Sequence, residues 1–178
     1  VGEWMHNKTP VQEQIRILRT MLTEIQEQAS DSEIYWSVEN NTLGEAALVV
    51  INEMGEENIP GTFISEPKKA GSNRSYRRGF TTTNKSKLAA CSKFKTWVET
   101  DKMEIASKSL LRETKTFIAR GAAYAAKDGE KDDLVMSALL VVRVAQQVSQ
   151  YDEITYNELK DSFSDEDDVE PMPISFLV

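Results

Sequence analysis

Apolar residues at helical spacing, together with residues suited to helix starts, predict four helices along the chain. The first has a continuous apolar face, with Pro10 suited to its first turn. The second begins at Thr42 and Glu45, which match the Thr-x-x-Glu capping box. The predicted helices cover residues 10–28, 42–54, 85–100 and 132–150.

Short segments rich in β-branched and aromatic residues alternate with these helices and predict strands. Residues 34–38 and 59–65 are the clearest, and residues 102–107 are a weaker candidate. Residues 66–79 are predicted to be a loop, and residues 121–129 a hairpin. Residues 109–118 fit either a helix or a strand. The alternation predicts an α/β fold with a mixed β-sheet flanked by helices.

Length and composition fit one globular domain, because 178 residues with 40% hydrophobic content can bury a core. We expect this domain to cover residues 1–150, followed by an acidic tail over 151–178. No apolar run approaches the roughly 18 residues of a membrane span, so no membrane association is expected. The single cysteine, Cys91, excludes an internal disulfide and any cysteine-rich zinc site. The only histidine, His6, is better explained as a solvated loop residue than as a ligand.

Charge is distributed unevenly, although the net charge is −8. Residues 67–95 hold nine basic residues and no acid, whereas residues 151–178 hold nine acids and one base. The basic stretch is a candidate surface for a polyanion. The candidate contacts with the nucleic-acid backbone are Arg74, Arg77, Arg78, Lys85 and Lys87.

Three acidic side chains stand at positions where carboxylates can do chemistry. Glu39 directly follows the predicted strand 34–38, at the edge where α/β folds commonly place ligands. Asp132 and Asp133 open the last apolar helix, where acids are also favoured simply as helix caps. Capping explains one acid well, but two adjacent acids repel each other unless a cation lies between or beside them.

A set of carboxylates without histidine or cysteine is typical of a hard divalent cation such as Mg²⁺ or Mn²⁺. Two such ions about 3.5–4 Å apart can activate a water and stabilise the leaving oxygen in phosphodiester hydrolysis. Glu39, Asp132 and Asp133 are therefore candidate metal ligands and catalytic residues. We expect Asp133 to be the primary ligand of the pair and Asp132 to be a second ligand or an orienting residue.

Four motifs occur in register along residues 1–150: "VENNTLGEAAL", "RRGFTTTNKSKL", "SLLRETKTFI" and "GEKDDLVMSALLV". Together they resemble the C-terminal nuclease domain of the large terminase subunit of tailed, T4-like bacteriophages. The resemblance implies an RNase H-like fold and a magnesium-dependent endonuclease, a hydrolase that cuts concatemeric DNA by two-metal catalysis during DNA packaging. It also implies double-stranded DNA, the portal and the small terminase subunit as partners, and the host cytoplasm as the location.

The sequence departs from that family in two respects. The family's first metal-binding Asp lies on an opening strand, and no such strand precedes Glu39 here, so we expect the first strand or strands to be missing. The ATPase motor's phosphate-binding loop is also absent. The resemblance therefore predicts an incomplete active site and little or no activity for this chain alone. Two alternatives are a non-catalytic module that binds DNA or packaging proteins on an RNase H-like scaffold, and another RNase H-like nuclease such as a junction resolvase.

Overall fold

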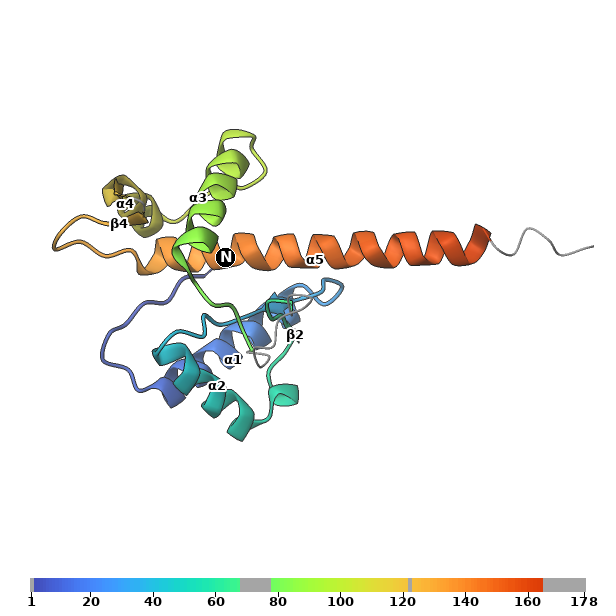
Figure 1. Ribbon diagram of the computed structural model, residues 1–178. Coiled ribbons are helices and arrows are strands. Elements are labelled where there is room, and N and C mark those ends of the chain that lie inside the picture. The colour runs from blue at the N-terminus through green and yellow to red at the C-terminus, as the bar shows by residue number, and fades with distance from the viewer. Residues whose placement is uncertain (1, 68–77, 122, 165–178) are drawn as a thin grey trace, which may run out of the picture. The chain divides into compact units, whose positions relative to one another are not determined.

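The computed structural model describes residues 2–67, 78–121 and 123–164, with only the backbone described beyond residue 150 (Figure 1). The chain divides into two units, Val1–Ala145 and Gln146–Val178. It is a mixed α/β protein, as predicted. In chain order its elements are α1 (Val11–Gln28), β1 (Tyr35–Trp36), α2 (Leu43–Met54), η1 (Glu56–Asn58), β2 (Thr62–Phe63), α3 (Asn84–Glu99), α4 (Lys108–Thr116), β3 (Phe117–Arg120), β4 (Ala123–Ala126) and α5 (Asp133–Ser164).

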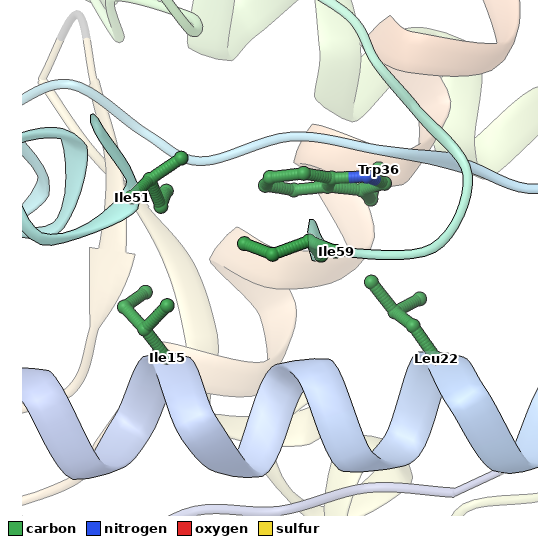
Figure 2. Close-up of a cluster of buried hydrophobic side chains, with 5 residues drawn as sticks. All are labelled: Ile15, Leu22, Trp36, Ile51 and Ile59. Atoms are coloured by element: carbon green, nitrogen blue, oxygen red, sulfur yellow. The ribbon is translucent and has the colours of Figure 1, made fainter. Parts of the chain in front are cut away.

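The first hydrophobic cluster forms where the apolar face of α1 packs beneath α2 and β1. Figure 2 shows Ile15 and Leu22 projecting from α1 toward Trp36 of β1 and toward two further isoleucines. These are Ile51 of α2, which is completely buried, and Ile59, which follows η1. The Trp36 and Phe63 rings meet edge to face at 4.7 Å between centroids, so the parallel pair β1–β2 is joined through its side chains as well as its backbone.

The chain after β1 continues as an extended ribbon beside residues 78–81. Glu39 and Phe80 form an isolated parallel bridge, in which the Phe80 N–H donates to Val38 and the Asn40 N–H donates to Phe80. The buried Asn40 side chain also donates to the Arg78 carbonyl oxygen and accepts from the Thr81 hydroxyl. This polar network fixes the backbone on both sides of Glu39.

A second hydrophobic cluster joins α3 to the first turns of α5. Its buried members are Ala90, Val135 and Leu139, against which Phe94 and Phe117 pack. The antiparallel hairpin β3–β4 lies beside this cluster, with the Phe117 and Tyr124 rings stacked at 6.1 Å. Residues 133–145 of the last helix therefore belong to the first unit.

Several predicted elements are confirmed, because α1, α2, α3 and the start of α5 lie where the sequence pattern placed them. The hairpin predicted over 121–129 begins earlier, since its first strand, β3, covers Phe117–Arg120. The ambiguous segment 109–118 contains both a helix and a strand, α4 and the start of β3. The strand expected over 102–107 is wrong, since these residues form no strand. The predicted loop 66–79 falls mostly outside the described residues.

Two further expectations differ from the structure. The described residues form two separate two-stranded sheets instead of a single mixed sheet. The last helix continues to Ser164, well past its predicted end at Gln150, so the first half of the expected acidic tail is helical. Within the described ranges, every helix is too short or too polar to cross a lipid bilayer.

Candidate metal and phosphate site

Glu39 lies on the ribbon that leaves β1, in the wall of a small cavity. The cavity has a volume of about 10 Å³ and is lined also by Thr82, by Lys87 of α3 and by Arg143 of α5. The Glu39 carboxylate accepts a hydrogen bond from the Asn41 amide at 3.0 Å. β1 ends at Trp36, so Glu39 follows the strand by three residues and pairs instead with Phe80.

Gly44 in the first turn of α2 allows the helix to approach the backbone of Glu39. A Cβ atom at position 44 would lie 1.5 Å from the Glu39 carbonyl oxygen, which is far inside any permitted contact. Any side chain there would push apart α2 and the ribbon that carries Glu39. The glycine of the "VENNTLGEAAL" motif thus has a steric role directly behind the candidate site.

Lys87 connects the two acidic segments of the site. Its ammonium lies 3.6 Å from a carboxylate oxygen of Asp132, and the same side chain lines the cavity with Glu39. The Lys87 side chain is 16% exposed, and its ammonium lies 5.1 Å from the centroid of the Phe117 ring. Lys87 is thus paired with Asp132 and also lines the cavity in whose wall Glu39 lies.

Glu113, and neither of the two aspartates, caps the start of α5 with its side chain. One buried carboxylate oxygen of Glu113 accepts from the backbone N–H groups of Leu134 at 2.8 Å and Val135 at 3.1 Å. Asp132 is the N-cap residue of α5, because its carbonyl accepts the first helical hydrogen bond, from Met136. An N-cap side chain at Asp132 would otherwise accept hydrogen bonds from these same two N–H groups. The Asp132 carboxylate is consequently available for Lys87, and Asp133 is exposed on the first turn.

Arg143 is a second, deeper cation beside Glu39. Its guanidinium donates to the Thr81 carbonyl at 3.2 Å, lies 3.4 Å from Glu66 and stacks over the Phe80 ring at 4.8 Å. Burial lowers the pKa of the Arg143 guanidinium, while the negative charges of Glu66 and Glu39 partly oppose this change. Arg143 links α5 to the ribbon beside Glu39.

The charged side chains that line the cavity are one acid, Glu39, and two bases, Lys87 and Arg143. Among the described residues, no three His, Cys, Asp or Glu side chains converge closely enough to hold a metal ion. Mg²⁺ is nevertheless often held by only one or two carboxylates, with waters and phosphates completing its shell. Glu39 lies in the cavity wall beside Lys87 and Arg143, and Asp132 is ion-paired with Lys87, so a metal ion held by these two carboxylates stays a prediction.

The predicted nucleic-acid contacts are distributed unevenly with respect to this site. Arg74 and Arg77 lie outside the described residues. Arg78 is already paired with Glu56 and lies over the Phe63 ring at 4.9 Å, so its guanidinium contributes to the fold. Lys85 is exposed on the first turn of α3, two residues before Lys87. Of these basic residues, Lys87 is the one that lines the cavity.

A larger apolar cleft of about 760 Å³ lies along α3. Its lining includes Leu88, Val98 and Leu111, together with Cys91. Burial raises the pKa of the Cys91 thiol, and Lys87 opposes that rise only in part. The single acid of the lining, Glu99, is 3.7 Å from Lys95, so this cleft does not have the donors of a metal site.

Three residues that sequence reasoning did not assign to the site contribute to its geometry. Asn40 fixes the ribbon, Glu113 caps α5, and Arg143 connects the two segments. Asn40 and Glu113 fall inside the motifs quoted above, which was the only available signal. Comparison with models of known protein families finds no match for this chain.

Proposed function

We propose that this chain is the nuclease portion of a viral DNA-packaging terminase, built on an RNase H-like fold. In this proposal it is a metal-dependent endonuclease that hydrolyses phosphodiester bonds of double-stranded DNA. The support is the order of the four motifs together with the placement of their acids. The mixed α/β class of the chain is compatible with such a fold.

The observation that supports the proposal is the position of Lys87, which is ion-paired with Asp132 and lines the cavity in whose wall Glu39 lies. Helix capping does not account for Asp132, because Glu113 already accepts the N–H groups that its side chain would cap. A role for Asp132 other than capping is therefore favoured.

In the proposed site, Glu39 and Asp132 hold a divalent ion, and Asp133 is an additional ligand or orients the first two. Bound Mg²⁺ or Mn²⁺ supplies activation of a water and stabilisation of the leaving oxygen. The preference from sequence for Asp133 as the primary ligand stays a prediction; Asp132 is ion-paired with Lys87. A two-ion site would require one further carboxylate.

Lys85 and Lys87 would contact the DNA backbone in this proposal, with Arg74 and Arg77 of the adjacent basic stretch. Such contacts position a duplex without reading its sequence. The portal and the small terminase subunit, as partners in the host cytoplasm, are part of the same proposal.

A second candidate is a non-catalytic module that binds DNA or packaging proteins. The observation that favours it is the convergence of fewer than three ligating side chains within the described part of the chain. A junction resolvase with the same scaffold would share the acids. It would differ in the DNA that it cuts, four-way junctions in preference to linear duplex.

Isothermal titration with Mn²⁺ tests the proposal on the whole chain. Glu39→Gln and Asp132→Asn should each weaken Mn²⁺ binding at least about tenfold, because each removes one of two charged ligands. Glu24→Gln, an exposed position of α1, is the matched control and should leave the affinity unchanged. Equal Mn²⁺ affinity in all four proteins would favour the non-catalytic module.

A further inference from the structure

The apolar cleft along α3 leaves large hydrophobic side chains in contact with solvent. Leu88 and Val98 of α3 are 48% and 37% exposed, and Leu111 of α4 is 42% exposed. All three line the cleft, whose lining residues belong entirely to the first unit. Its volume of about 760 Å³ lies within the range of roughly 300–1,000 Å³ that is typical of binding sites. A contiguous exposed apolar surface of this kind is typical of an interaction site.

The two helices that frame the cleft are basic, although the whole chain has a net charge of −8. Together α3 and α4 carry seven basic residues and two acidic ones. Both acids already have partners, since Glu99 lies 3.7 Å from Lys95 and Glu113 caps α5. Arg112 and Lys115 are exposed on α4, each directly after a residue of the cleft lining. The cleft therefore fits a ligand with bulky apolar side chains and a neighbouring acidic stretch.

The C-terminal segment of the chain has this composition. Residues 165–178, "DEDDVEPMPISFLV", contain five acids and no base, and the acids precede an apolar end. The apolar end includes Ile174, Phe176 and Leu177. This terminal segment lies outside the described residues. Peptides of such composition bind by placing a few apolar anchors in a groove and charged residues at its edge.

We propose that the terminal segment of one copy of the chain binds in the apolar cleft of a second copy. Its apolar end fills the cleft, and its acids face Arg112 and Lys115. The stretch of α5 from Leu139 of the cleft lining to Ser164 is about 37 Å long, at a helical rise of about 1.5 Å per residue. This length favours the cleft of a neighbouring copy over that of the same chain. The inference does not depend on the proposed nuclease activity.

A charge-exchange experiment on the full chain tests the proposal by sedimentation velocity. The original protein should associate as its concentration rises. Arg112→Glu with Lys115→Glu gives a chain with an acidic cleft edge, and Asp167→Lys with Asp168→Lys gives one with a basic terminal segment. Each variant alone should associate at least about tenfold more weakly, because like charges face each other in the complex. An equimolar mixture of the two should associate as the original protein does, since each cleft then meets a segment of opposite charge.

The matched charge control reverses two exposed arginines of α1, outside the cleft lining. Arg16→Glu with Arg19→Glu makes the same change in net charge as the cleft variant and should associate as strongly as the original protein. Weaker association of this control by the same factor would show that net charge alone governs association, and that result overturns the proposal. Failure of the mixture to restore association overturns it as well, and so does a chain that stays monomeric at every concentration.

Two apolar substitutions test whether the cleft holds the end of the segment. Leu111→Ser and Phe176→Ser should each weaken association about tenfold, because each removes a side chain that is buried in the complex. Val49→Ser, at a 57% exposed position of α2, is the matched control and should change association by less than about twofold. Unchanged association of both Leu111→Ser and Phe176→Ser overturns the proposal. Circular dichroism verifies folding, and the charge-exchange pair tests the proposal independently if Leu111→Ser does not fold.

Discussion

The carboxylate of Glu113 accepts a hydrogen bond from the backbone N–H of Val135, at a distance of 3.1 Å between buried atoms. The contact joins α4 to the first turn of α5, across the β3–β4 hairpin that separates them in sequence. It also satisfies N–H groups that would otherwise be orphaned at the helix start. The stability of this half of the first unit should therefore depend on one acidic side chain.

Glu113→Ala should lower the free energy of unfolding by about 2 kcal/mol, because two backbone donors lose a charged acceptor. Glu113→Gln retains an acceptor oxygen and should cost roughly half as much. Chemical denaturation monitored by circular dichroism measures both. Glu104→Ala, an exposed position before α4, is the control and should change stability by less than about 0.5 kcal/mol.

Gly44→Ala should destabilise the protein by about 3 kcal/mol, because the new Cβ would overlap the Glu39 carbonyl oxygen. In a thermal melt this corresponds to a decrease of roughly 10 °C in Tm. The neighbouring exposed substitution Ala46→Ser, in the same helix turn, should leave Tm nearly unchanged. A Gly44→Ala protein with unaltered Tm would show that α2 is not held against Glu39.

Ile51→Ala should cost about 3 kcal/mol, since the side chain is completely buried between α1 and β1 and its removal leaves a cavity. Val49→Ala, two residues earlier in α2, removes a side chain that is 57% exposed and should cost less than about 0.5 kcal/mol. The two midpoints of urea denaturation are compared directly. Similar losses at both positions would contradict the observed packing of α2.

Cys91 should react slowly with iodoacetamide at pH 8, because burial raises its pKa and reduces the fraction of reactive thiolate. The rate in the native protein should be at least about tenfold lower than in guanidinium, as measured by mass spectrometry. Because the pKa of Cys91 is higher in the folded than in the unfolded protein, Cys91 makes the free energy of unfolding depend on pH. Its contribution to stability is complete below the ordinary thiol pKa, and it decreases as the pH rises toward the pKa of the folded protein. Native and denatured rates that agree would place Cys91 in open solvent.

Helix boundaries were predicted correctly where an apolar face marked the whole helix. The capping pattern, in contrast, did not identify the residues that cap the helices. The apolar face of α1 predicted its bounds almost to the residue, because burial against α2 requires that spacing. Thr42 matches the capping pattern, yet its side chain caps nothing and its φ is +41°. The actual capping box joins Thr83 to Ser86 at the start of α3, with serine in place of the glutamate that the pattern requires.

The candidate site was predictable only in part, for a comparable reason. The placement of Glu39 after a strand could be read from local pattern, because strand composition and the abrupt change to polar residues are local. The pairing of Lys87 with Asp132 and the capping by Glu113 connect residues far apart in the chain. Such contacts depend on tertiary packing, so no single segment encodes them. The motif resemblance suggested which acids matter but gave no information on which cation they meet.

Glu39 and Asp132 are carried by different hydrophobic clusters of the first unit, so their relative position depends on the contacts between the two clusters. Glu39 is carried by the ribbon above the cluster of Trp36 and Ile51, whereas Asp132 is carried by the cluster of Val135 and Leu139. Among the described residues, Arg143 of α5 contacts Thr81, Glu66 and the Phe80 ring near Glu39. Transient local opening between the two clusters would move the Glu39 and Asp132 carboxylates apart while both hydrophobic clusters stayed intact. Amide exchange at Phe80 and Asn40 should then be faster than in the centre of α1.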